Sequence, residues 1–398
     1  MNILLWIVIV AVTIPTMILA VEVVASAAGR RRLRGRPIAG QRRPAVDVLV
    51  PAHDEEHSIA VTIASIQSQM RPGDRLTVIA DNCQDGTAEI AERLSAHVVR
   101  RRDEERRGKG FAVQFGLEAT KADAREVVVI VDADCVLAES CLDRLAARCG
   151  ASGRPVQASY RMSAGAGASA TMAIREFAWD LKNRIRPLGL ASLGGPCQLQ
   201  GTGMAFPRQA LDAVEVGTAH IVEDLKLGLD LAKAGHPPLF EPAAAVESFF
   251  PPSELGMRRQ HERWQRGSLS IVLTHALPCL YAALRRGDPR LLCLALDLLV
   301  PPIVMLGALS GVAVLLAGLY AAIVGEWLPL AVAIGSFMLL LSGLALGWRV
   351  AEMRGGRVSP IFIARFVTGR ILAYPTALFS RSTAAWLRSE RPSGPQAP

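Results

Sequence analysis

Residues 46–56 of the 398-residue chain read VDVLVPAHDEE, a short apolar run that ends in a cluster of acids. Two later stretches repeat this pattern, LTVIADNCQDGT at 76–87 and EVVVIVDADC at 126–135. The apolar runs are typical of buried strands. The segments between them have helical spacing and cover residues 58–69, 87–95 and 110–121. This alternation of strands and helices predicts an α/β domain with a mainly parallel sheet.

The composition indicates a second, membrane-embedded part. Hydrophobic residues make up 51% of the chain and charged residues 20%, which is too apolar for an ordinary soluble enzyme and too polar for membrane spans alone. Residues 3–21 are almost uninterruptedly apolar, and an arginine cluster follows at 30–43. In a cleaved signal peptide the positive charges come first. We therefore predict a retained N-terminal span with the arginine cluster in the cytosol.

Apolar runs return near the C-terminus. They cover residues 291–324 and 328–347 and are joined by a short polar link, which predicts a transmembrane hairpin. The segment 361–379 carries Arg365 and Arg370, so an interfacial helix is favoured there over a further span.

These patterns divide the chain into an N-terminal anchor, a basic linker, a catalytic domain, an interfacial segment, a transmembrane hairpin, and an interfacial helix with a cytosolic tail. In that order they are expected at residues 1–28, 29–44, 45–271, 272–290, 291–348 and 349–398. Seven cysteines without a CxxC pair argue against a zinc site or a disulfide framework and suit a reducing cytosol.

The net charge of +8 permits nucleic acid, anionic lipid or a phosphorylated substrate as partner. We assign the cluster at 30–43 to the membrane flank and a second cluster at 100–109 to a substrate-facing position. No nucleic-acid partner is expected.

Acids follow each of the three predicted strands, at the edge where ligands bind in open α/β sheets. Asp132 and Asp134 follow the third strand. Alternate residues of an extended segment point the same way, so both carboxylates are expected to reach one metal-bound diphosphate. Asp54 and Asp81 follow the other two strands. Each acid alone also fits a turn or a helix cap, the role we favour for Asp85.

Two later motifs contain further groups, a base and a phosphate contact, that would be needed to transfer a sugar to an acceptor hydroxyl. Glu223 and Asp224 begin a predicted helix, where acids also favour the helix dipole; in the functional interpretation Asp224 is the base. Gln260, Arg263 and Trp264 share one helix face, and they suit phosphate contact and stacking on a sugar ring. A salt-bridged arginine and a membrane-proximal tryptophan are the plainer alternative.

The motifs PAHDEE, ADNCQDGT, RGKG, VDADC, QGTGMAF, VEDLKLG and QHERW occur in this order between residues 46 and 267. This region resembles the inverting family 2 glycosyltransferases. More narrowly, it resembles their membrane-bound branch, which contains cellulose, hyaluronan and poly-N-acetylglucosamine synthases and exopolysaccharide glycosyltransferases. The resemblance implies a glycosyltransferase A-type nucleotide-sugar-binding fold. It also implies transfer from a UDP-linked donor to a lipid-linked or growing polysaccharide acceptor at the cytosolic face of the inner (plasma) membrane.

The resemblance assigns donor-side roles to single residues. Asp54 and Asp81 would contact the nucleoside, and Lys109 would contact the donor phosphates. Asp132 would lie near the ribose and the diphosphate. Asp134 would ligate Mg²⁺ or Mn²⁺.

On the acceptor side, Asp224 matches the base of the family's TED motif. Gln260, Arg263 and Trp264 match the QxxRW motif, which holds the diphosphate and borders the acceptor site. Residues 200–204 resemble the segment that lines the acceptor side.

The chain departs from the family pattern in three ways. VED replaces TED, and Asn82 in DNCQDGT takes a position that is often acidic. About three spans fit the length criterion, fewer than in the large polymer synthases, which puts polymer translocation through this chain alone in doubt.

Two other functions share parts of this pattern. A nucleotidyltransferase that makes an activated sugar would share the fold and the acids, but it gives no reason for QHERW or for membrane spans. A non-catalytic membrane scaffold would not explain why the acids at 81, 132, 134 and 224 are retained, because buried carboxylates are costly without a partner.

Overall fold

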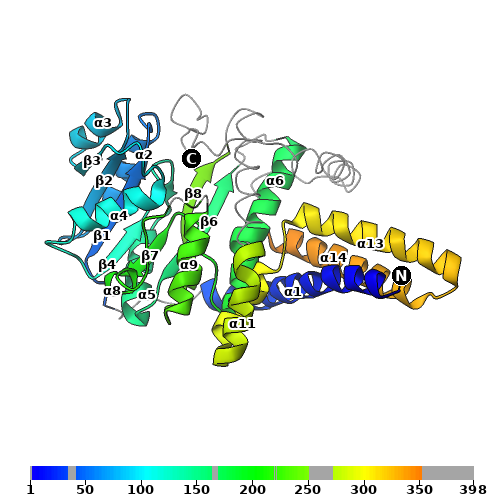
Figure 1. Cartoon of the computed structure of the whole chain (residues 1–398). Coiled ribbons are helices and arrows are strands. Elements are labelled where there is room, and N and C mark those ends of the chain that lie inside the picture. Colours follow the sequence, from blue (N-terminus) through cyan, green and yellow to red (C-terminus); the bar gives the residue numbers. More distant parts are fainter. Residues whose placement is uncertain are drawn as a thin grey trace. The chain divides into compact units, whose positions relative to one another are not determined.

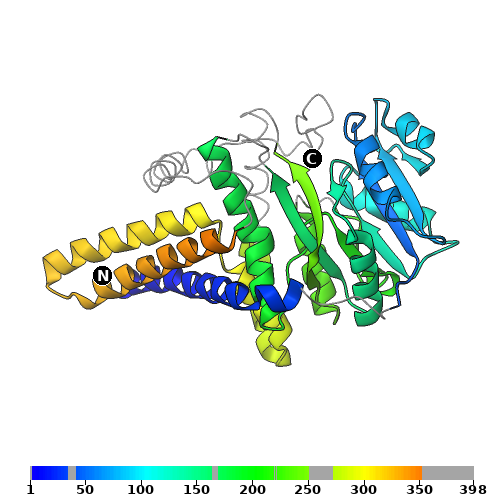
Figure 2. The ribbon, with the colours of Figure 1, turned by 180° about the vertical axis from the view of Figure 1, so that it is seen from behind.

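The computed structural model describes residues 2–34, 42–163, 169–218, 220, 222–250 and 272–351. These residues fall into two compact units, which Figures 1 and 2 show from opposite sides. The helical unit contains the described residues up to 30, from 169 to 195 and from 272 onward. The sheet unit contains the described residues in 31–163 and 196–250.

The sheet unit contains a mixed sheet in the order β3-β2-β1-β4-β7-β6-β8-β5. The strands are β1 Val46–Ala52, β2 Arg75–Asp81, β3 His97–Arg101, β4 Val127–Ile130, β5 Val136–Leu137, β6 Val156–Ser163, β7 Met204–Pro207 and β8 Leu239–Phe249. β1 pairs in parallel with β2 and β4, and β2 pairs in parallel with β3. β7 runs antiparallel to β4 and β6. The predicted α/β class with a mainly parallel sheet is confirmed. The strands β3, β5, β6, β7 and β8 were not predicted.

Helices connect and cover the strands. They are α2 Ile59–Gln67, α3 Thr87–Arg93, α4 Lys109–Ala119, α5 Cys141–Ser152, α8 Arg208–Leu211 and α9 Glu223–Lys233. A core cluster joins one face of the sheet to α4, α8 and α9, with Leu49, Ile79, Val113 and Leu231 among its members. Parallel strands need such crossovers, and as a result the carboxyl ends of β1, β2 and β4 lie at one edge of the sheet.

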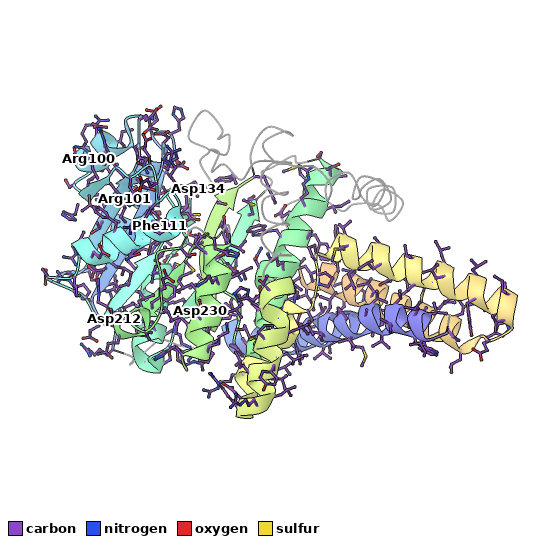
Figure 3. All side chains as sticks on the ribbon, viewed as in Figure 1. Arg100, Arg101, Phe111, Asp134, Asp212 and Asp230 are labelled. Atoms are coloured by element: carbon purple, nitrogen blue, oxygen red, sulfur yellow. The ribbon has the colours of Figure 1, made fainter. Side chains whose placement is uncertain are left out.

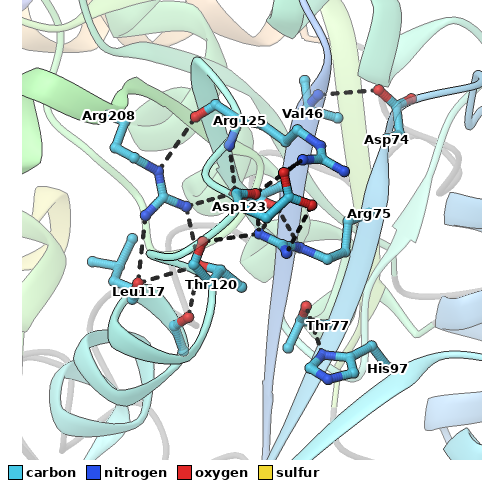
Figure 4. A network of polar contacts seen from close by, with 12 residues as sticks. Val46, Asp74, Arg75, Thr77, His97, Leu117, Thr120, Asp123, Arg125 and Arg208 are labelled. Atoms are coloured by element: carbon cyan, nitrogen blue, oxygen red, sulfur yellow. Dashed lines mark hydrogen bonds and ion pairs between the residues drawn. The ribbon is translucent and has the colours of Figure 1, made fainter.

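The opposite ends of these strands are tied together by the fully buried carboxylate of Asp47. Asp47 Oδ1 accepts a hydrogen bond from Arg75 Nε at 2.7 Å. Its Oδ2 accepts from the Arg208 guanidinium at 2.6 Å and from the Arg125 backbone N–H at 3.0 Å. Figure 4 shows the arginines of this network. One side chain thus links β1, β2, the start of α8 and the segment before β4.

The helical unit is built around three long helices, α1 Asn2–Arg34, α13 Ile303–Val324 and α14 Leu328–Val350. All three are long and apolar enough to cross a membrane, and they run side by side in Figures 1 and 2. The N-terminal candidate span is Ile3–Arg30, shifted by two residues from the anchor predicted at 1–28. The remaining helices of this unit are α6 Ala170–Asp180, η1 Leu181–Ile185, α7 Arg186–Ser192, η2 Val272–Ala276, α11 Leu277–Arg286 and α12 Pro289–Leu298.

Two sequence predictions need separate comment. The apolar run at 291–324 is two helices, α12 and α13, because Pro301 and Pro302 interrupt it. The predicted interfacial helix at 361–379 lies outside the described residues.

Buried charges fasten α1 within the helical unit. Arg186 Nε donates to Glu22 Oε2 of α1 at 2.6 Å. The same guanidinium donates to the Asp297 carbonyl at 2.9 Å and pairs with the Asp297 carboxylate. Buried ions are tolerated only when they are paired, so this triad fixes how α1, α7 and α12 pack together.

The role of Asp47 gives a stability prediction. Asp47→Asn removes the negative charge that pairs with two arginines and presents N–H groups to them. The free energy of unfolding should therefore fall by about 3 kcal/mol. Thermal denaturation of the detergent-solubilised chain should show a midpoint lower by roughly 6–12 °C.

Asp123→Asn serves as the matched control. Asp123 pairs with Arg125 and Arg75 in the same network, but its side chain is 72% exposed, and exposed pairs contribute less than about 1 kcal/mol. Equal shifts in the two variants would contradict the anchoring role of Asp47.

Candidate active site

The carboxyl edge of the sheet collects the predicted donor-side residues. Arg101 and Asp134 lie toward this end of the strands in Figure 3, whereas Asp212 and Asp230 lie toward the other end. Asp81 is the last residue of β2, and Asp132 follows β4 after one residue. The three acidic clusters of the sequence therefore come together as expected for an α/β ligand site.

Asp81 is 2% exposed and forms a buried ion pair with Arg101, whose guanidinium donates to Asp81 Oδ1 at 2.7 Å. The same guanidinium donates to Asp103 at 2.8 Å and to the Arg106 carbonyl at 2.6 Å, and it lies over the Phe111 ring. Burial raises the pKa of Asp81, although Arg101 opposes this shift. Asp81 Oδ2 is buried without a hydrogen-bond partner among the described residues. This oxygen can accept an N–H from a ligand.

Asn82 explains one departure from the family pattern. Its Nδ2 donates to Asp81 Oδ1 and to the Asp103 carbonyl, both at 3.1 Å, and its Oδ1 accepts the Asp103 N–H at 2.9 Å. This position therefore needs a donor and an acceptor, which an amide supplies and a carboxylate does not. The residue has φ +52°, which asparagine and aspartate tolerate better than most residues.

The loops after β1 and β2 are bonded to each other. Asp54 Oδ1 accepts the backbone N–H of Gln84 at 2.7 Å. Asp85 accepts the backbone N–H groups of Thr87 at 3.0 Å and of Glu56 at 3.1 Å. The turn role predicted for Asp85 is confirmed. The nucleoside contact assigned to Asp54 stays a prediction.

The basic residues of the cluster at 100–109 differ in their burial and in their partners. Arg100 is about half exposed and pairs with Glu89 and Glu92 of α3. Arg101 is buried against Asp81, and Lys109 lies among carboxylates. The substrate-facing interpretation of the whole cluster is therefore wrong for Arg100, because neighbouring acids already neutralise it. Sequence reasoning also missed that Arg101 belongs to the Asp81 site.

Lys109 begins α4 and lies at the centre of the site. Its Nζ donates to the Gly201 carbonyl at 2.6 Å and pairs with Asp132. Burial alone would lower the pKa of Lys109, but the charges of Asp132, Glu223 and Asp224 raise it well above its usual value. The ammonium thus stays charged and draws together segments that are far apart in the sequence.

Gly201 lies between Lys109 and Asp224. It has φ +92°, and a Cβ built there would lie 3.4 Å from Asp224 Oδ2 and 3.5 Å from Lys109 Nζ. A side chain at this position would enter the space beside the predicted base. A glycine keeps that space open and adopts the backbone conformation without strain.

Glu223 and Asp224 form the first turn of α9, where their charges suit the helix dipole. The predicted helix start is confirmed. Burial, followed by the charge of Asp224, raises the pKa of Glu223 to about 7, while Lys109 acts in the opposite direction. The segment before α9 passes close to α4 at Gly110. A Cβ built on Gly110 would lie 2.7 Å from the Thr218 carbonyl oxygen, so this position has no room for a side chain.

Asp132 and Asp134 can hold a divalent cation. Their carboxylate oxygens and the Cys135 sulfur all lie within 4.8 Å of one another. Residues 132–135 form a turn in which the Cys135 N–H donates a hydrogen bond to the Asp132 carbonyl. The extended backbone predicted for this segment is therefore wrong, although the two carboxylates still lie close together. Burial raises the pKa of Cys135, whose thiol donates to Asp134 Oδ1 at 3.5 Å. Two carboxylates beside a protonated thiol fit a hard cation such as Mg²⁺ or Mn²⁺.

Three predicted site residues, Gln260, Arg263 and Trp264, lie outside the described residues. Their assigned contacts with the diphosphate and the acceptor stay predictions.

A family comparison matches the region that contains this site. The model for Glycosyltransferase like family 2 matches residues 44–267, more than half of the chain. The chain belongs to this family. Its sheet unit has the glycosyltransferase A fold, with a mostly parallel mixed sheet.

Individual proteins also resemble this chain. The glycosyltransferase AglD of Haloferax volcanii is 37% identical over 106 residues, which cover 22% of this chain and 16% of that protein's length. The mannosyltransferase PcManGT from Pyrobaculum calidifontis, solved with GDP-Man and Mn²⁺, has a TM-score of 0.58 at 19% identity and covers 95% of this chain and 100% of its own. A glucosyl-3-phosphoglycerate synthase from Mycobacterium tuberculosis has a TM-score of 0.35 at 24% identity and covers 57% of this chain and 78% of its own. The mannosyltransferase shows the shared fold.

The bonding of Asn82 can be tested. Asn82→Asp should weaken nucleoside diphosphate binding about tenfold, because a carboxylate loses the bond to the Asp103 carbonyl and adds a negative charge beside Asp81. Isothermal titration with UDP and with GDP in Mn²⁺ measures this loss. Gln84→Glu is the matched control, since it adds the same charge to an exposed side chain of the same loop. Equal affinities in the two variants would show that the amide is not required.

Proposed function

We propose that this protein is an inverting glycosyltransferase that moves a sugar from a nucleotide-sugar donor to an acceptor hydroxyl. The observation that carries the proposal is the gathering of Lys109, Asp132 and Asp224 around Gly201 within a family 2 domain. Such a transfer needs a cation for the diphosphate and a carboxylate base close to it. In this cluster Lys109 offers a positive charge to the diphosphate, and Asp224 is the proposed base.

On the donor side, Asp81 Oδ2 has no hydrogen-bond partner in the described part of the chain, and it suits a nucleobase with a ring N–H, as in uracil or guanine. A UDP-linked donor is our expectation. The mannosyltransferase with the shared fold was solved with GDP-Man, so a guanine nucleotide fits the same chemistry. Asp54 is proposed to contact the nucleoside, and Asp132 the ribose and diphosphate. Lys109 supplies positive charge to the donor phosphates.

Asp134, with Asp132 beside it, is proposed to hold Mg²⁺ or Mn²⁺. A bound cation would neutralise the charge of the diphosphate leaving group. Cys135 orients Asp134 through its thiol and needs no role as a ligand.

In the transfer step, Asp224 takes the proton of the acceptor hydroxyl. The acceptor oxygen forms a bond to the anomeric carbon on the face opposite the diphosphate. The bond from that carbon to the diphosphate breaks, and the nucleoside diphosphate leaves. The product therefore has the inverted configuration. Gln260, Arg263 and Trp264 are proposed to hold the diphosphate and border the acceptor, as in the membrane-bound branch of the family.

The three candidate spans support a membrane location. In the same helical unit, α11 exposes Leu277, Tyr281 and Leu284 on one face and ends with Arg285 and Arg286. An exposed apolar face next to arginines suits the headgroup level of a bilayer. We propose an inner-membrane protein with a cytosolic catalytic domain that uses a lipid-linked or exopolysaccharide acceptor.

The proposed activity is tested with the full chain in nanodiscs. Among UDP- and GDP-linked sugars, one donor should release its nucleoside diphosphate in Mn²⁺ or Mg²⁺, and EDTA should abolish this release because the diphosphate then lacks its counter-charge. Liquid chromatography of the released nucleotide is the measurement. A protein that leaves every donor intact would refute the proposal, and full activity in EDTA would remove the metal from it.

The role of Asp224 is tested separately. Asp224→Asn should lower sugar transfer by about 10³-fold, because an amide cannot take the acceptor proton, while nucleoside diphosphate affinity stays within about threefold of wild type. Asp230→Asn, on the same helix but paired with Lys226, is the control and should leave transfer unchanged. Unchanged turnover in Asp224→Asn would rule out this residue as the base.

A further inference from the structure

Gln157 is a fully buried glutamine on β6 whose side chain holds a loop of the site. Its Nε2 donates to the Thr202 carbonyl at 2.9 Å and to the Ala158 carbonyl at 2.8 Å. Its Oε1 accepts the Gln200 N–H at 2.9 Å. Both ends of the amide are therefore committed to backbone groups, and two of these belong to residues 200–203, here called the site loop.

The site loop contacts the residues on which the proposed function rests. The Gly201 carbonyl accepts the Lys109 ammonium at 2.6 Å. Thr202 Oγ1 accepts the backbone N–H of Asp132 at 3.0 Å. Gly201 itself lies beside Asp224. The site loop thus sets the spacing between the donor side and the base.

We infer that Gln157 is a positioning residue that holds the site loop so that the acceptor hydroxyl lies in line between Asp224 and the donor. This inference rests on the proposed glycosyl transfer. Gln157 acts through the site loop, because its amide already bonds the loop backbone and that of Ala158.

A glutamine is the residue this position requires. A glutamate of the same length would place lone pairs against the carbonyls of Thr202 and Ala158, and a methionine would leave these buried groups without partners. Each buried polar group without its hydrogen bond carries a free-energy cost. The residues QASY at 157–160 gave no sign of this role, since a glutamine inside a strand usually lies on the exposed face.

Loss of this support should affect transfer more than donor binding. The donor-side residues Asp81, Lys109 and Asp132 stand on or directly beside β2, α4 and β4, and the packing of these elements keeps them in place when the site loop shifts. A displacement of about 1 Å between base and acceptor costs roughly 10²-fold in rate. Water needs no positioning by the site loop, so donor hydrolysis should persist and the ratio of transfer to hydrolysis should fall.

The experiment compares wild type, Gln157→Met and Gln157→Glu in nanodiscs. The donor is the nucleotide sugar that wild type consumes, and the acceptor probe is a total polar lipid extract. Three quantities are measured: nucleoside diphosphate affinity, donor hydrolysis without acceptor, and incorporation of radiolabelled sugar into lipid.

Gln69→Met is the matched control. The Gln69 amide also makes three backbone bonds, to Ser65, Ala138 and Leu142, none of which belongs to the site loop. This variant therefore reports the general effect of losing such a glutamine.

Both Gln157 variants should keep nucleoside diphosphate affinity within about threefold of wild type and lose about 10- to 100-fold in the ratio of transfer to hydrolysis, while Gln69→Met keeps the wild-type ratio. Retained affinity shows that the variants are folded. A wild-type ratio in Gln157→Glu, or an equal loss in Gln69→Met, would overturn the positioning role. Wild-type protein that consumes no donor would instead refute the proposed function.

Discussion

The site depends on one ammonium group among several carboxylates. Lys109 pairs with Asp132, and Glu223 and Asp224 raise its pKa further. Without that charge, acids from β4 and α9 would face each other in a partly buried space, where like charges repel strongly. The same ammonium reaches the Gly201 carbonyl, so the charge that stabilises the cluster also locates the site loop. The apolar core packs α4 and α9 on the sheet, and this charge holds their first turns beside the site loop.

Several parts of this arrangement were predictable because they depend on local patterns. The strands β1, β2 and β4 are short apolar runs, and each is followed by acids, so their shared edge follows from the rules of parallel sheets. The acids at the start of α9 are equally local. The helical spans follow from length and hydropathy, although Pro301 and Pro302 divide what the sequence presents as one run.

The parts that were not predictable depend on partners far apart in the sequence. Arg101 is one of several consecutive arginines, and only the pairing of β3 with β2 selects it to face Asp81. The Gln157 side chain reaches residues more than 40 positions away, and no periodicity encodes that distance. Asp47 likewise joins arginines from remote segments. Buried polar contacts of this kind depend on the order and pairing of the strands. The sequence pattern predicted the fold class but not that order.

The charge of the site also bears on the need for a metal, independently of any relative. Among the described residues, the carboxylates of Asp132, Glu223 and Asp224 lie around the ammonium of Lys109, and Asp134 lies close to Asp132. A nucleotide-sugar diphosphate is itself anionic, so its approach to these groups alone would be opposed by Coulomb repulsion. Partial protonation of Glu223, whose pKa is about 7, relieves only part of this charge. The proposed divalent cation at Asp134 would supply positive charge at the point where the diphosphate is proposed to lie. The electrostatics of the described residues therefore support the metal dependence that the family resemblance suggested.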